Sequence, residues 1–263
     1  MKSRIASIMK AKSLDSSITG CQTFNLSELD LVSHLEFQLP INLRLGHLIE
    51  RIVAELIRSS TKYKLLYENI QIIEDKKTIG EIDFIIQDEN TKQCIHLELA
   101  YKFYLYDPSI SVEPINNWIG PNRNDSLKEK LEKLKTKQFP ILYHDCTATL
   151  LNTLAIHEVS QALCFLVSLF IPFDYQGIYH PVFQKAIKGY YINVETFKSL
   201  NSVDKTYYLP IKTEWGIDPT ENETWTDFND VVKYIYLSIK QKQSPLCWQK
   251  HKNSYLQFFI VWW

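Results

Sequence analysis

Two neighbouring segments constrain the fold of this chain more than any other feature of its sequence. They are Thr78–Gln87 (TIGEIDFIIQ) and Gln93–Leu105 (QCIHLELAYKFYL), and only the polar turn Asp88–Lys92 separates them. Both segments alternate apolar and polar residues with a period of two, which is typical of half-buried β-strands. The sequence therefore predicts an antiparallel hairpin.

The alternation also predicts how the two strands pair. When Asp83 lies opposite Glu98, Glu81 pairs with Ala100 and Ile85 pairs with His96. One face is then wholly apolar, and its residues are Ile82, Phe84, Ile86, Ile95, Leu97 and Leu99. A slip of one residue would mix the two faces. Because directly opposed Cβ atoms lie about 4.5–5.5 Å apart, we expect the Asp83 and Glu98 carboxylates to stand side by side.

The flanking sequence predicts further elements. An apolar face at helical spacing predicts a helix from a cap at Asn42 to Arg58, and residues 64–74 have the pattern of a strand. Ser126 and Glu129 form a capping box for a helix that ends at Gln138, before Pro140. That helix carries several lysines, which either follow a phosphate backbone or form a solvated face: Lys128, Lys130, Lys133, Lys135 and Lys137.

The order of these elements predicts a mixed α/β fold, with a sheet flanked by helices. We expect residues 1–40 to be irregular, residues 41–145 to form the core, and residues 146–263 to form an aromatic-rich C-terminal region packed on that core. The apolar run at residues 162–173 is too short to span a bilayer, so it predicts a buried helix or strand. A further helix is expected around residues 225–239.

Composition excludes several classes of protein. The net charge of −1 is incompatible with a globally basic nucleic-acid coat, although it allows a local basic groove. The sequence contains neither a GxGxxG nor a P-loop motif, and five cysteines without a CxxC pair indicate reduced thiols. The first residues contain no apolar run of the length found in secretory signals. We expect a cytoplasmic protein without a membrane partner, and its oligomeric state stays open.

Neighbouring carboxylates repel each other, so Asp83 and Glu98 require a compensating cation. One candidate is Lys102, which lies on the same strand face four residues after Glu98. The cluster would then be a set of salt bridges on a solvated sheet face. The other candidate is a divalent cation, because two carboxylates with waters suit Mg²⁺. Such an ion would support phosphodiester hydrolysis.

The run from Leu45 to Lys102 resembles the core of the PD-(D/E)XK nuclease-like superfamily. The segment GEIDF at residues 80–84 is similar to the GEIDL segment of resolvase-like members, and Glu50 lies where their helical glutamate lies. More specifically, the chain resembles an uncharacterised bacterial family, domain of unknown function 1853. The matching pieces are LGH at 45–47 with Glu50, TIGEIDF at 78–84, HLELAYKFYL at 96–105 and WIGPN at 118–122.

This resemblance implies a restriction-endonuclease-like core, Mg²⁺ or Mn²⁺, and hydrolysis of DNA or RNA. Asp83, Glu98 and Glu50 would bind the metal, and Lys102 would be the catalytic lysine. One departure concerns that lysine, because the superfamily carries it two residues after the glutamate, where this chain has Ala100. The resemblance is therefore also consistent with an inactive nuclease fold that binds nucleic acid or protein.

Four further residues are candidates for a supporting role around these carboxylates. Glu81 and His96 lie on the predicted polar face of the hairpin, and His47 lies one helical turn before Glu50. Gln138 ends the lysine-rich helix and could orient a phosphate or the lysine. For His47, His96 and Gln138, a purely structural or surface role is the alternative. No substrate-binding residue can be named from the sequence.

Overall fold

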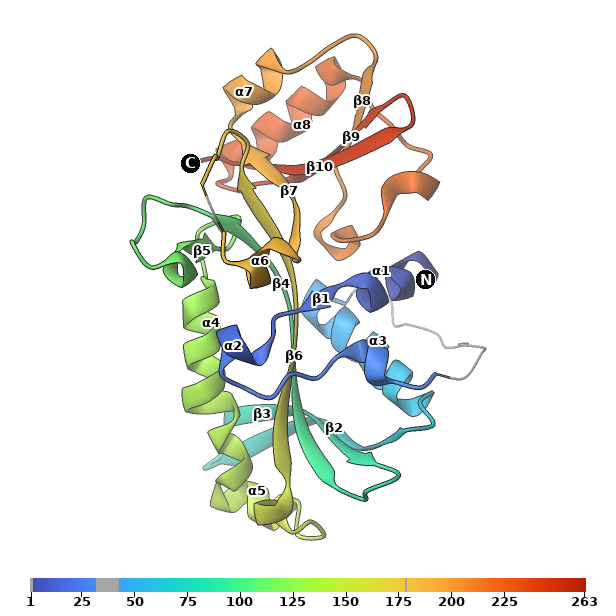
Figure 1. The fold of residues 1–263 in the computed structure, drawn as a ribbon, viewed down its shortest axis with the longest axis vertical. Helices are drawn as coiled ribbons and strands as arrows, with labels where there is room; N and C mark the ends of the chain where they lie inside the picture. The colour runs from blue at the N-terminus through green and yellow to red at the C-terminus, as the bar shows by residue number, and fades with distance from the viewer. Residues whose placement is uncertain (1, 32–42, 178) are drawn as a thin grey trace. The chain divides into compact units, whose positions relative to one another are not determined.

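The computed structural model of the chain describes residues 2–31, 43–177 and 179–263. In these residues a mixed sheet of ten strands is flanked by helices (Figure 1), as the sequence predicts. The hydrogen-bonded order is β2-β3-β4-β6-β7-β10-β9-β8, with β1 beside β6 and β5 beside β4. The strands are β1 (Lys12–Ser13), β2 (Tyr63–Glu74), β3 (Lys77–Asp88), β4 (Cys94–Tyr106), β5 (Trp118–Ile119), β6 (Ser160–Pro172), β7 (Ile187–Ile192), β8 (Lys205–Tyr208), β9 (Leu246–His251) and β10 (Ser254–Ile260).

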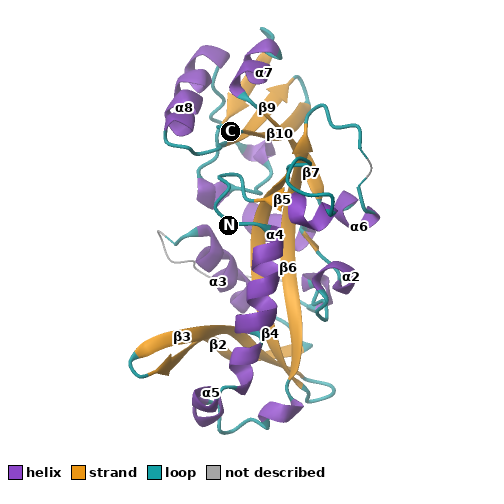
Figure 2. Cartoon of the chain, turned by 90° about the vertical axis from the view of Figure 1, so that its left-hand side faces the viewer, coloured by secondary structure: helices purple, strands orange, loops and turns teal. Residues whose placement is uncertain are grey.

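The helices lie both before and between these strands (Figure 2). They are α1 (Lys2–Lys10), α2 (Ser16–Thr19), α3 (Leu45–Arg58), α4 (Leu127–Lys133), α5 (Asp145–Leu150), α6 (Pro181–Gln184), α7 (Val194–Ser199) and α8 (Phe228–Lys240). A π-helical turn, Leu134–Gln138, continues α4 and is followed by a 3-10 turn, Pro140–Tyr143. Further 3-10 turns are Leu26–Glu28, Pro114–Asn117, Ile156–Glu158, Lys212–Glu214 and Pro219–Glu221. No described helix is long and apolar enough to cross a membrane.

The chain divides into two compact units. The first contains residues 1–11, 102–128 and 167–263, and the second contains residues 12–101 and 129–166. The units are thus built from interleaved segments rather than from the three consecutive ones expected from the sequence. The N-terminal part also differs from the irregular segment expected there, because α1 and α2 are helical.

The predicted hairpin is confirmed. Strands β3 and β4 are antiparallel, and Phe84 pairs with Leu97 while Ile85 pairs with His96, which is the register that the alternation predicts. Strand β2 and helix α3 are confirmed as well, whereas the proposed cap Asn42 lies outside the described residues. The run at residues 162–173 lies almost entirely in β6, so it is a strand.

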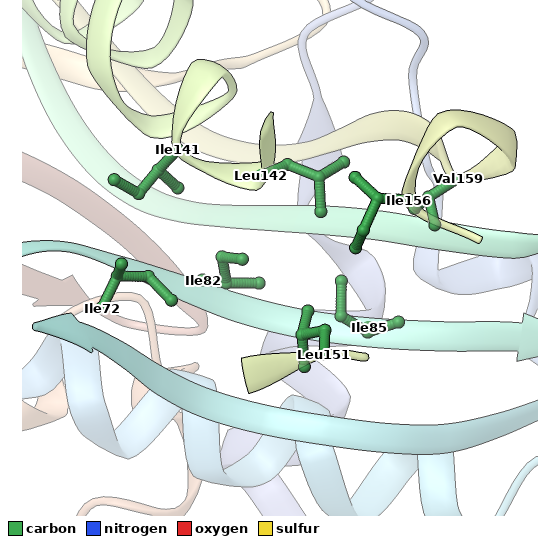
Figure 3. Close-up of a cluster of buried hydrophobic side chains, with 8 residues drawn as sticks. All are labelled: Ile72, Ile82, Ile85, Ile141, Leu142, Leu151, Ile156 and Val159. Atoms are coloured by element: carbon green, nitrogen blue, oxygen red, sulfur yellow. The ribbon is translucent and has the colours of Figure 1, made fainter. Parts of the chain in front are cut away.

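The polar face of the hairpin is covered rather than solvated. Ile85, which lies on this face of β3, packs with Ile141 and Leu142 in a buried cluster that also contains Ile72, Ile82, Leu151, Ile156 and Val159 (Figure 3). The close approach requires a glycine, since a Cβ atom on Gly80 would lie 2.8 Å from Cγ1 of Ile141. The solvated salt-bridge face considered from the sequence is therefore wrong, because residues 138–142 lie on it.

The first unit has its own aromatic core. Phe197, Tyr207 and Phe258 are buried together, with Val231 and Ile235 of α8 packed against them. Phe197 and Tyr207 meet edge to face with ring centroids 5.1 Å apart, a favourable arrangement for aromatic rings. The aromatic-rich C-terminal sequence thus supplies the core of this unit.

Candidate functional site

Asp83 of β3 and Glu98 of β4 form the centre of the candidate site, in the second unit. The ladder pairs of β3 and β4 run from Gln87–Cys94 to Phe84–Leu97, one position short of these carboxylates. At that point Oδ2 of Asp83 accepts a hydrogen bond from the backbone N–H of Leu99 at 2.8 Å. The exposed fractions are 8% for Asp83 and 0% for Glu98. Both residues therefore lie just beyond the last ladder pair of the hairpin, as the sequence predicts. Their burial strengthens the repulsion between the two carboxylates when both are charged.

Each oxygen of Glu98 accepts a side-chain hydrogen bond. Nε2 of His96 lies 2.9 Å from Oε1, and Nε2 of Gln138 lies 2.6 Å from Oε2. The amide of Gln161 donates to Nδ1 of His96 at 3.1 Å and to the carbonyl of Phe139 at 2.8 Å. Since Nδ1 accepts, the hydrogen of a neutral His96 is on Nε2 and is donated to Glu98. His96 and Gln138 thus hold the Glu98 carboxylate in one orientation.

Burial and neighbouring carboxylates raise the pKa values of two carboxyl groups in this site. Burial, followed by the charge of Glu98, raises the pKa of Asp83 well above its ordinary range, although the Leu99 N–H opposes this. Burial and the charge of Glu50 raise the pKa of Glu81. Glu50 also raises the pKa of Asp83, whereas Lys130 lowers it. Four predicted carboxylates therefore act on one another in this part of the second unit.

Glu50 reaches the group from helix α3. It lies on the first half of that helix, and its Oε2 is 3.0 Å from Nδ1 of His47. His47 is an exposed residue, with 63% of its side chain accessible, and it acts on Glu81 only electrostatically. The structure therefore brings Glu50 to the candidate site and leaves His47 at its rim.

Lys102 has a different partner from the one the sequence suggests. Its Nζ lies 2.7 Å from Oδ2 of Asp125. Both residues belong to the first unit, whereas Asp83 and Glu98 belong to the second. The structure therefore records Lys102 in an ion pair with Asp125 rather than with the paired carboxylates.

Lys130 is the basic residue that sequence analysis did not single out. Its Nζ donates a 2.7 Å hydrogen bond to Oε1 of Gln138, whose amide in turn donates to Glu98. A signal was present, because Lys130 follows Leu127 by three residues and precedes Leu134 by four, which places it beside the buried stripe of the helix. The other lysines of this helix are exposed, and Lys130 alone among them is half-buried.

The fit of a metal ion to these residues is mixed. Mg²⁺ uses oxygen ligands and retains several waters, so one or two carboxylates suffice for it. Asp83 and Glu98 provide them, and a carboxylate oxygen that accepts one hydrogen bond keeps a second lone pair. Among the described residues, however, Asp83, Glu98 and Glu50 do not bring three ligand atoms within 4.8 Å of one another. The two hairpin carboxylates therefore fit a hydrated ion that keeps several of its waters.

Three other side chains do bring their ligand atoms this close together. Ligand atoms of Glu74, His144 and Cys146 lie within 4.8 Å of one another. Nδ1 of His144 accepts from the backbone N–H of Cys146 at 3.3 Å, so the hydrogen of a neutral His144 is on Nε2, which lies 3.6 Å from Glu74. A metal at Nε2 would have to displace that hydrogen and break the helix cap. The arrangement is explained by the helix cap at Nδ1 and by the Nε2 hydrogen that faces Glu74.

Comparison with known proteins gives one family. The model of the family described as "Domain of unknown function (DUF1853)" matches residues 8–257, which is nearly the whole chain. No curated protein and no solved structure gives a significant match.

Proposed function

The chain belongs to the family described as domain of unknown function DUF1853, and for this member we propose a divalent-metal-dependent nuclease that hydrolyses phosphodiester bonds in DNA or RNA. The proposal includes a restriction-endonuclease-like core of the PD-(D/E)XK type around β2, β3 and β4. The observation that carries it is the buried pair of Asp83 and Glu98, on one face of a hairpin, with the charge of Glu50 acting on it. Two buried like charges destabilise a fold unless a cation compensates them.

In the proposed mechanism each residue has a separate task. Asp83 and Glu98 hold Mg²⁺ or Mn²⁺, and the backbone N–H of Leu99 fixes Oδ2 of Asp83. His96 and Gln138 orient Glu98, as partners of metal-binding carboxylates do in other sites. A bound divalent ion polarises a phosphate and acidifies water. Glu50 and Glu81 add negative charge around the pair and strengthen its attraction for a cation.

Calorimetric titration with Mg²⁺ and Mn²⁺ tests the metal site directly. Asp83→Asn and Glu98→Gln keep the shape of each side chain and remove one charge, and we expect each to weaken binding by about tenfold or more. Glu89→Gln is the matched control, because Glu89 is in the turn of the same hairpin and pairs with Lys92. Unchanged affinity in both site variants would exclude this metal site.

A screen of DNA and RNA substrates then tests the reaction. The wild-type protein is expected to cleave at least one of them only when Mg²⁺ or Mn²⁺ is present, and Asp83→Asn is expected to abolish cleavage. A wild type that binds the ion and cleaves none of the substrates would contradict the nuclease proposal.

A second candidate function is nucleic-acid binding without cleavage. Two observations favour it: Ala100 stands where the superfamily has its lysine, and Lys102 pairs with Asp125. This candidate predicts binding that persists in EDTA and weakens as salt increases, because phosphate contacts release counterions. Binding that requires Mg²⁺ would favour the nuclease instead.

A further inference from the structure

The paired carboxylates have a positively charged neighbour within their own unit. Lys130 is half-buried on α4, and its charge acts on Asp83. Its ammonium donates to Oε1 of Gln138, and the amide of the same Gln138 donates to Oε2 of Glu98. A continuous line of hydrogen bonds therefore connects Lys130 with Glu98.

The π-helical turn explains why Lys130 and Gln138 can meet. They are eight residues apart, and in an α-helix of 3.6 residues per turn such residues are offset by about 80° around the axis. The segment Leu134–Gln138 is π-helical instead. Each residue of a π-turn rotates the chain less about the helix axis than an α-helical residue does. Gln138 therefore returns to the side of the helix that carries Lys130. Single π-turns are frequent at functional sites.

We propose that Lys130, positioned with Gln138, is the cationic residue of the Asp83–Glu98 site and the group that meets the phosphate of a bound phosphodiester. This role is the one that the family resemblance gave to Lys102. An ammonium on a flexible four-carbon stem suits it, since the stem can extend toward a phosphate when one binds. Gln138 is a positioning residue, because it acts through Glu98 and Lys130. The claim that Lys130 meets a phosphate rests on the proposed function, whereas its role as the cation of the carboxylates does not.

The first test is a double-mutant cycle that requires no activity. Lys130→Met keeps the length of the stem and removes the charge, and the shift of the urea midpoint is measured in the wild type and in Asp83→Asn. If Lys130 serves the carboxylates, we expect its removal to shift the midpoint at least twofold less in the Asp83→Asn background. Lys133→Met, on an exposed position of the same helix, is the matched control and should give equal shifts in both backgrounds.

The second test uses cleavage of whichever substrate the wild type accepts. We expect Lys130→Met to lower kcat about 100-fold or more, as loss of a charge-stabilising group does, with KM changed far less. Lys130→Arg keeps the charge and should recover at least part of the lost kcat. Lys102→Met is compared with it, and we expect the smaller loss of kcat there.

The outcomes separate this inference from the proposed function. Equal midpoint shifts for Lys130→Met in both backgrounds would overturn the inference, and so would a greater loss of kcat in Lys102→Met than in Lys130→Met. If the wild type neither binds Mg²⁺ nor cleaves, the proposed function fails. A smaller shift in the Asp83→Asn background would still support Lys130 as the cation of the pair.

Discussion

At the scale of single residues, Glu98 depends on the groups that hold it. It is fully buried, and Gln138 donates to its Oε2. Gln138→Leu would leave this oxygen without its donor, so we expect the free energy of unfolding to fall by about 1–3 kcal/mol. Urea denaturation measures the change, and Lys137→Leu on the exposed neighbouring position is the control, with an expected change within about 0.5 kcal/mol. Equal effects of the two substitutions would contradict the role of Gln138.

Asp83 should make the stability of the protein depend on pH. Burial and the charge of Glu98 raise its pKa, so the folded chain retains a proton that the unfolded chain releases. The free energy of unfolding therefore falls as pH rises from the ordinary carboxyl pKa of about 4 toward the raised native value. Asp83→Asn cannot ionise, and its side-chain oxygen can still accept from Leu99. In metal-free buffer the variant should be more stable than the wild type at pH 7.

Urea denaturation between pH 3.5 and pH 8 in EDTA checks this expectation. The advantage of Asp83→Asn should vanish below about pH 4, where the wild-type carboxyl group is protonated in both states. Glu89→Gln, in the exposed turn, controls for removal of any single acidic charge. A wild-type curve that runs parallel to the Asp83→Asn curve at all pH values would contradict the raised pKa.

At the scale of elements, the hairpin shows what sequence alone can predict. Period-two alternation permits one register, and the structure confirms it at Phe84–Leu97 and Ile85–His96. A solvated salt-bridge face was one of the two alternatives left open by the sequence, and the burial of Asp83 and Glu98 contradicts it. The alternation could not decide between them, because it reports only which residues share a face. The segment that covers this face comes from residues 138–142, more than forty positions after the hairpin strand β3. Such distant packing leaves no local pattern in either segment.

The candidate site divides in the same way between predicted and unpredicted parts. Asp83 and Glu98 were predicted from the register, and Glu50 from the family resemblance. Lys130 was not singled out, because its contact with Gln138 requires a π-turn that the sequence pattern does not reveal. Lys102 was named from strand alternation, which gives the face of a side chain and not its partner, and Asp125 lies in a different element.

Substitution of two glycines, Gly80 and Gly46, tests how the elements pack around the site. A Cβ at Gly80 would lie 2.8 Å from Cγ1 of Ile141, so Gly80→Ala should push β3 away from the 3-10 turn and lower the free energy of unfolding by about 1–3 kcal/mol. A Cβ at Gly46 would meet only Oε1 of Glu50, at 3.9 Å. Gly46→Ala on helix α3 should therefore raise stability by about 0.5–1 kcal/mol. Urea denaturation compares the two, and changes of the same sign would contradict this packing.

At the scale of the whole molecule, the chain passes repeatedly between its two units. Strands β4 and β6 each contribute residues to both, with the division after Tyr101 in one and after Leu166 in the other. The paired carboxylates, Glu50, Glu81, His96, Lys130 and Gln138 all lie in the second unit, and Lys102 with Asp125 lies in the first. A ligand that binds the carboxylates is therefore expected to stabilise the second unit directly.

Hydrogen–deuterium exchange with and without Mg²⁺ tests this expectation on the intact chain. A ligand at 100 times its Kd stabilises the folded state that binds it by about 2.7 kcal/mol. We expect slower exchange in β3, in residues 94–101 of β4 and in the π-turn Leu134–Gln138, with α5 changing least among the helices of this unit. Asp83→Asn should abolish the effect. Protection that centres on residues 144–146 would instead assign the ion to the Glu74–His144–Cys146 trio and contradict a cation at Asp83 and Glu98.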